Sequence, residues 1–191
     1  MQRQHGIGMT SPLEAAGLQP RQRLTEHRTI LAIDPGSVSS SWVIWDSVGS
    51  YVADQGEGTN EDVKTMLKED RSVSAAWPAT QPDLLLIEGV AHYGMAVGAE
   101  VFDTVFWSGR FVEAWNGEWK KVSRRDVKLT LCGSARAKDA NVRQALIDRF
   151  GGKATAIGRK AQKGPLYGVG GHRWSALAIA ITWSELHASE T

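Results

Sequence analysis

Two carboxylates stand at positions where a charge is costly. Asp34 closes the apolar run TILAID, and Glu88 closes the apolar run LLLIE. Burial of an ionised carboxylate is unfavourable without compensation, and two adjacent carboxylates raise each other's pKa unless a cation lies between them. Oxygen ligands favour Mg²⁺, and Mn²⁺ can replace it. The pair therefore predicts a divalent-metal site.

Such a site suits the hydrolysis of phosphodiesters. Two ions about 4 Å apart can activate a water molecule and stabilise the leaving oxygen. Taken alone, each acid is more typical of a turn or of an ion pair at a strand end, because Asp-Pro-Gly is a common turn sequence. The metal site requires that the two runs be neighbouring strands that end at one edge of a sheet.

The elements around these acids predict such a sheet. Asp34 and Glu88 would end two central parallel strands, because a continuous apolar run suits a strand buried on both faces. Strands are expected over residues 29–34, 40–45, 50–54, 83–88 and 119–122, and helices over 60–67, 96–115, 123–132, 139–150 and 172–187. Asn60, Ser123 and Asp139 are the expected helix caps. The order predicts an α/β fold with a five-stranded mixed sheet, in which a three-strand antiparallel meander is joined to two parallel strands and flanked by helices.

The charge distribution points to a polyanionic partner. The chain has 191 residues and a formal net charge of +1. Residues 119–163 contain thirteen Lys and Arg against three acids, a charge of +10, whereas the rest contains nine against eighteen, a charge of −9. A basic region within a nearly neutral protein is expected to bind a polyanion. The alternative is a solvated helical surface, which usually carries more interspersed acids.

The remaining composition indicates one intracellular domain. Residues 1–28 are polar and are expected to form a flexible leader, and residues 29–191 a single domain. No apolar run has the length of a membrane span or of a secretory signal. Cys132 is the one cysteine, which excludes a disulfide framework. We expect a cytoplasmic protein with no membrane partner.

Four blocks of the sequence resemble the RuvC-type Holliday junction resolvases, within the RNase H-like nuclease superfamily. They are AIDPGSVSSSWVIWD (32–46), LLLIEGV (84–90), VSRRDVKLTLCGSARAKDANVRQALI (122–147) and HRWSALAIAIT (172–182). The blocks occur in the family's order and span about residues 29–187. The form of the last block resembles bacteriophage versions of the family.

The resemblance implies an RNase H-like fold and a crossover junction endodeoxyribonuclease. Its catalytic residues would be Asp34, Glu88, His172 and Lys138, and its ligands for two Mg²⁺ ions (or Mn²⁺) would be Asp34, Glu88, His172 and Ser175. The family usually has two acids at the last two ligand positions, so Ser175 is the main departure. A neutral imidazole at residue 172 can bind a metal or move a proton, whereas Ser175 brings no charge.

The resemblance also implies how DNA is held. The residues expected to contact DNA are Arg124, Arg125, Lys128, Arg136, Lys138, Arg159, Lys160, Lys163, His92 and Tyr93. His92 and Tyr93 would engage the junction core, where an aromatic ring can stack on an unpaired base. The apolar helix 96–115 resembles the family's dimer helix, and a two-fold homodimer would present two sites to the two symmetric strands of a four-way junction.

Two alternatives remain. The first is a junction- or DNA-binding protein derived from the nuclease and weakened at Ser175. The second is an ATPase of the actin and sugar-kinase class, whose first turn also reads Asp-x-Gly. The chain is short for the second domain and the further phosphate loops of that class, so no nucleotide cofactor is expected.

Overall fold

A five-stranded mixed sheet forms the centre of the computed structural model, which describes residues 29–69, 82–91 and 96–188. The strands are β1 (Thr29–Asp34), β2 (Ser39–Asp46), β3 (Tyr51–Thr59), β4 (Leu84–Gly89) and β5 (Glu118–Ser123). Their order is β3-β2-β1-β4-β5. The β1–β2 and β2–β3 pairs are antiparallel, whereas β1–β4 and β4–β5 are parallel. The predicted sheet is therefore confirmed.

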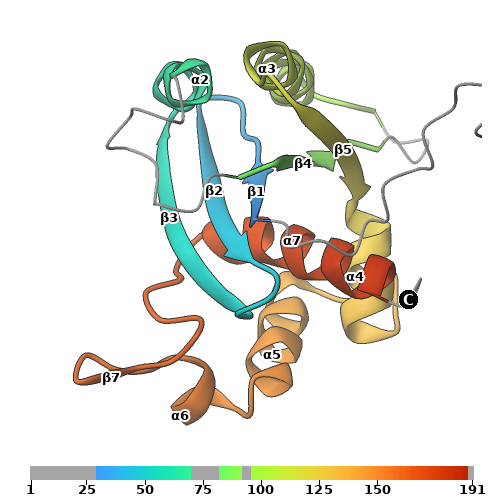
Figure 1. Ribbon diagram of the computed structural model, residues 1–191. Helices are drawn as coiled ribbons and strands as arrows, with labels where there is room; N and C mark the ends of the chain where they lie inside the picture. Colours follow the sequence, from blue (N-terminus) through green and yellow to red (C-terminus); the bar gives the residue numbers. More distant parts are fainter. Residues whose placement is uncertain (1–28, 70–81, 92–95, 189–191) are drawn as a thin grey trace, which may run out of the picture.

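Helices cover both faces of this sheet (Figure 1). They are α2 (Asn60–Lys68), α3 (Ala99–Ala114), α4 (Arg124–Cys132), α5 (Asp139–Arg149), α6 (Lys153–Ala156) and α7 (Arg173–Ala188). In the view of Figure 1, α2 and α3 lie on one side of the strands, and α7 crosses the other side with α4 and α5 packed against it. The sheet thus lies between two layers of helices in a three-layer α/β arrangement.

The two faces of β1 belong to two separate hydrophobic cores. Ile30 and Ala32 pack in the core under α7, whereas Leu31 and Ile33 pack in the core under α2 and α3. This follows from the alternation of side chains along a strand. All four are at most 2% exposed. Burial on both faces explains why the sequence of β1 is a continuous apolar run.

One of the three predicted helix caps is confirmed, and the other two are wrong by one residue. The Ser123 side chain caps α4, and Gly133 ends it in the left-handed conformation, as the sequence predicted. Thr59, and not Asn60, is the N-cap of α2, and its hydroxyl accepts from the Asp62 amide. Lys138, and not Asp139, is the N-cap residue of α5. Both misplaced caps are the first residues of their helices, so their side chains are free for other contacts.

The Asn60 side chain forms hydrogen bonds that hold the turn after β1. It is 1% exposed. Its side chain accepts a hydrogen bond from the Ser40 hydroxyl (2.7 Å) and donates one to the Gly36 carbonyl (3.0 Å). The Gly36 amide in turn donates to the Ser40 hydroxyl (3.2 Å). This network ties the turn after Asp34 to β2 and to α2.

Residues 153–168, for which no helix or strand was expected, contain regular structure. They form α6 and a short hairpin of β6 (Gly158–Arg159) and β7 (Gln162–Lys163). The Val52 amide donates to the Pro165 carbonyl (3.0 Å), which attaches the segment to the edge strand β3. The hairpin projects from the body of the protein in Figure 1. Among the described residues, no helix is long and apolar enough to cross a membrane.

Replacing Asn60 with Ala should destabilise the fold by about 1–3 kcal/mol, because Ser40 and the Gly36 carbonyl lose their buried partner. Urea unfolding followed by circular dichroism measures this change. Gln144→Ala, on the exposed surface of α5, is the control and should change the free energy of unfolding by less than about 0.5 kcal/mol. Equal effects of the two substitutions would contradict the role given to Asn60.

Candidate active site

Four polar side chains form one row across the sheet. The strand register aligns Glu57 of β3 with Ser41 of β2, and Ser41 with Asp34 of β1. Ile33 pairs with Ile87 across the parallel strands, so Asp34 and Glu88 come next to each other. Aligned side chains point to the same face of a sheet, here the face covered by α7. We call Glu57, Ser41, Asp34 and Glu88 the polar row.

Asp34 and Glu88 form the buried centre of this row. The side chain of each is 13% exposed. Burial raises the pKa of Asp34 to about 8, and its hydrogen bond with Glu88 and the charge of Glu88 act in the same direction. The charge of Arg124 and a hydrogen bond with Ser175 lower this pKa in part. The two carboxyls therefore share a site that lacks sufficient positive charge.

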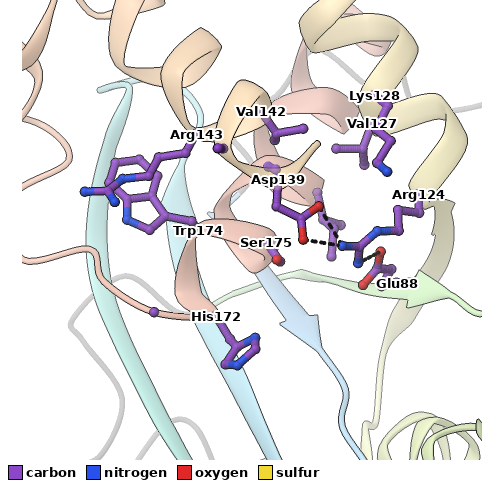
Figure 2. Close-up of a pocket in the computed structure, with 14 residues that line it drawn as sticks. Glu88, Arg124, Val127, Lys128, Asp139, Val142, Arg143, His172, Trp174 and Ser175 are labelled. Atoms are coloured by element: carbon purple, nitrogen blue, oxygen red, sulfur yellow. Dashed lines mark hydrogen bonds and ion pairs between the residues drawn. The ribbon is translucent and has the colours of Figure 1, made fainter. Parts of the chain in front are cut away.

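Arg124 supplies the positive charge on the Glu88 side. Its guanidinium donates to Glu88 (3.1 Å) and makes a two-pronged contact with Asp139 (2.7 and 2.8 Å), as Figure 2 shows. Burial disfavours its charge, but the carboxylates of Glu88 and Asp139 outweigh this and raise the pKa of Arg124. Arg124 begins α4 and Asp139 begins α5, so this ion pair joins β4 to two helices.

The start of α7 brings His172 and Ser175 to the same place. The His172 Nδ1 lies 4.0 Å from Asp34 Oδ2, and its side chain is 79% exposed. Ser175 lies one helical turn further and bonds to Asp34. Between them Trp174 is buried, and the guanidinium of the exposed Arg143 lies 5.1 Å from its ring centroid. The burial of Trp174 fixes the orientation of this first turn.

Two adjoining grooves meet at these residues. One, of about 430 Å³, runs between α4, α5 and α7 and is lined in part by Glu88, Lys128 and Arg143. The other, of about 400 Å³, is bounded by the turn 35–38 and by Asp34, Ser41 and Glu57. Arg124, Asp139, His172 and Ser175 line both grooves. The members of the polar row thus line two open grooves on the surface.

The structure brings together part of the predicted site. Asp34, Glu88, His172 and Ser175 converge, as the sequence predicted, and Lys128 lines the adjoining groove. Arg124, predicted as a contact to the DNA backbone, binds Glu88 and Asp139 in this structure. Lys138 is exposed beside Asp139 and lines neither groove.

The other predicted DNA contacts lie further out. Arg125, Arg136, Arg159, Lys160 and Lys163 are exposed and line neither groove, the last three on the β6–β7 hairpin. His92 and Tyr93 lie outside the described residues, as does the expected leader 1–28.

Three members of the site were missed in the sequence. Asp139 was assigned only as a helix cap, although an isolated acid in a strongly basic segment was a usable signal. Glu57 lies beyond residue 54, where the third strand was expected to end. Ser41 is 2% exposed, and its hydroxyl has no hydrogen-bond partner within the described chain.

The donor set suits a hard divalent cation. Within the described residues, no three Asp, Glu, His or Cys side chains are close enough to form a ready metal site. Two largely buried carboxyls, a hydroxyl and an imidazole nonetheless lie together around Asp34, and oxygen donors of this kind favour Mg²⁺ or Mn²⁺. A cation at this position would replace the positive charge that Arg124 provides and the proton that Asp34 retains.

Comparison with known proteins finds similar solved structures but no similar sequence family. No family model and no curated protein sequence matches the chain. A Thermus thermophilus RuvC structure matches with a TM-score of 0.58 and 16% identity, over 84% of this chain and 96% of that one. T. thermophilus RuvC in complex with a Holliday junction substrate matches with a TM-score of 0.58 and 14% identity, over 86% of this chain and 96% of that one. The chain therefore has a RuvC-like fold of the RNase H type.

Asp34 should make stability depend on pH in the absence of metal. Its pKa is about 8 in the folded chain against an ordinary 3.8, so between these values the folded state binds more protons and stability falls as pH rises. In EDTA, the Tm of the wild type should fall from pH 6 to pH 8 by at least about 2 °C more than that of Asp34→Asn. Differential scanning calorimetry measures this.

Mg²⁺ or Mn²⁺ at pH 8 should raise the Tm of the wild type and leave that of Asp34→Asn nearly unchanged, because the cation replaces the proton. Parallel pH profiles in EDTA, or an equal effect of the cation on both proteins, would contradict the electrostatic description of this site.

Proposed function

We propose that this protein is a metal-dependent endonuclease that resolves Holliday junctions or other branched DNA. The observation that carries the proposal is the buried Asp34–Glu88 pair, at the end of the two parallel strands of a RuvC-like fold and open to a groove. The match to a RuvC structure in complex with a Holliday junction substrate supports the choice of DNA substrate. The expected bacteriophage origin and cytoplasmic location remain predictions.

Each residue of the site has a proposed part in the chemistry. Asp34 would help to hold both divalent cations, Glu88 would help to hold one of them, and His172 with Ser175 would help to hold the other. Such cations supply charge neutralisation at the phosphate and an acidified water molecule. His172 is exposed enough to exchange a proton with solvent while its Nδ1 faces Asp34. Arg124 is placed to meet a phosphate oxygen if it leaves Glu88, and Lys138 is proposed as a further phosphate contact.

The basic residues around the grooves would hold the DNA arms. Lys128 and Arg143 line the groove beside Glu88, and the exposed Arg125 and Arg136 lie on the same α4–α5 segment. The β6–β7 hairpin carries Arg159, Lys160 and Lys163 away from the body of the protein, where they could contact an arm of a branched substrate. Contacts of this kind position the backbone and make binding depend on salt.

Helix α3 supports a homodimer. Phe102, Val105 and Phe106 are 64%, 51% and 60% exposed, whereas Phe111 on the same helix is fully buried. Large apolar side chains grouped on one exposed helical face commonly mark an interface between proteins. A two-fold dimer through α3 would direct two sites to two strands of a four-way junction.

A catalytically weakened DNA-binding protein is the second candidate. Ser175 lacks the charge that the family has there, and Arg124 already compensates Glu88. Both observations are compatible with a site that has lost its metal. Metal binding separates the candidates, because a protein that only binds DNA does not require it.

Cleavage of an end-labelled four-way junction tests the nuclease. The wild type should make paired, symmetric nicks with Mg²⁺ or Mn²⁺ and none in EDTA, and linear duplex should remain intact. Asp34→Asn should lower the rate by about 10³-fold or more, because a positioned carboxylate and its charge are lost together. Asp54→Asn is the matched control, since it removes a carboxylate from the opposite face of β3.

Tight binding of the junction without nicks in either metal would contradict the nuclease and favour the DNA-binding candidate.

Phe106→Glu should convert a wild-type dimer into a monomer, because it places a charge in the apolar interface. Sedimentation velocity measures the mass of each protein. Leu186→Glu, at a side chain of α7 that is 48% exposed, is the control and should remain dimeric. A wild type that is monomeric at tens of micromolar, with and without junction DNA, would contradict the dimer.

A further inference from the structure

Half of the polar row has no part in the chemistry described so far. Glu57 and Ser41 lie on the β3 side of Asp34, away from Glu88 and Arg124. Both line the groove that also contains Asp34, His172 and Ser175. Nothing in the proposed ligand set explains why a carboxylate and a buried hydroxyl are placed there.

Ser41 is the first sign that a ligand belongs at this position. It is 2% exposed and lines the groove, and its hydroxyl has no hydrogen-bond partner within the described residues. A buried hydroxyl without a partner is unfavourable, and native structures rarely leave one without a reason such as an unrecorded water or ion. Its neighbours in the row are the carboxyls of Asp34 and Glu57. A cation, or a water molecule bound to one, would satisfy all three groups.

Glu57 is the second, independent sign. No hydrogen bond or ion pair engages its carboxylate within the described chain. A Cβ built on Gly171 would lie 3.9 Å from Glu57 Oε2, so this carboxylate points to the residue immediately before His172. Arg124, the one guanidinium that lines this groove among the described residues, is bound to Glu88 and Asp139 at the other end of the row.

The spacing of the strands allows Glu57 to reach this position. Neighbouring strands lie about 4.8 Å apart, so the backbones of Glu57 and Asp34 are about 10 Å apart, with Ser41 between them. A cation midway is within reach of both carboxylates, directly or through a bound water. Gly171 has a φ of 57°, a left-handed conformation that favours glycine, and a Cβ placed there would be in van der Waals contact with the Glu57 carboxylate.

We propose that Glu57, together with Ser41 and Asp34, forms the cation position on the His172 side of the site. Glu57 thereby supplies the negative charge that Ser175 does not. The inference rests on the proposed metal-dependent function and assigns one of its two cations to ligands from β1, β2 and β3. Three oxygen donors with an imidazole nearby suit Mn²⁺ as well as Mg²⁺.

Mn²⁺ binding to the full-length protein tests this assignment without relying on activity. Electron paramagnetic resonance of free Mn²⁺ should give two bound ions for the wild type. Glu57→Gln should weaken one of them by about tenfold or more, in the range seen when groups supporting a metal site are removed. Asp54→Asn, on the same strand with its side chain on the opposite face, should bind like the wild type. Because Glu57 is exposed, its neutral replacement should leave the Tm in EDTA nearly unchanged.

A rescue variant adds a second readout. If Glu57 replaces the charge missing at residue 175, then Ser175→Asp in the Glu57→Gln background should restore the weakened site. The same Ser175→Asp change alone should improve Mn²⁺ binding less, because Glu57 already supplies a carboxylate there.

Two results would overturn the assignment: Mn²⁺ binding by Glu57→Gln equal to that of the wild type, or no Mn²⁺ binding by the wild type. Junction cleavage by the wild type in the same preparation separates this failure from failure of the proposed function. If the wild type cleaves the junction but Glu57→Gln binds Mn²⁺ like the wild type, only the assignment of Glu57 is rejected. If the wild type neither binds Mn²⁺ nor cleaves the junction, both proposals are rejected.

Discussion

The contact between the Asp34 and Glu88 carboxyls is the constraint on which the rest of the site depends. Two acids that are each 13% exposed cannot both ionise without positive charge beside them. The chain responds in two ways: Asp34 retains its proton to a pH of about 8, and Arg124 binds Glu88. Both responses leave the site ready for a cation, which would replace the proton and release the guanidinium.

This constraint also explains why the surrounding elements are where they are. Arg124 can reach Glu88 only because β5 leads directly into α4 beside β4, and Asp139 holds it there from the start of α5. The burial of Trp174 fixes the first turn of α7, which places His172 and Ser175 over Asp34. Residues from α4, from α5 and from the start of α7 therefore meet beside Glu88 (Figure 2).

The central strands could be predicted from the sequence, and the ion pairs across the site could not. β1 and β4 are buried on both faces, so each has a continuous apolar sequence that predicts a strand. The carboxylate that closes each apolar run marks where the strand ends. The contact of Arg124 with Asp139 depends on the packing of α4 against α5, which no local pattern specifies. An Asp at a helix start is typical of a cap, so the signal for Asp139 was ambiguous in the sequence.

The third strand shows a different limit. This strand was expected to end at residue 54, three residues short of Glu57, and Gly56 and Gly58 beyond that point disfavour a strand. In the structure a Cβ on Gly56 would lie 2.6 Å from the Trp42 ring. The glycine is thus required by the close approach of Trp42, and the strand continues to Thr59. Recognising Glu57 required the register of β2 and β3, which depends on packing and not on the local sequence alone.

The most direct test of the central claim, that the Asp34–Glu88 pair is a cation site held ready by Arg124, is anomalous diffraction from crystals of the full-length protein grown with Mn²⁺. The account predicts an anomalous peak in contact with the Asp34 and Glu88 carboxylates, with the Arg124 guanidinium withdrawn from Glu88. A structure at saturating Mn²⁺ without a peak at these carboxylates, and with Arg124 still bound to Glu88, would contradict it.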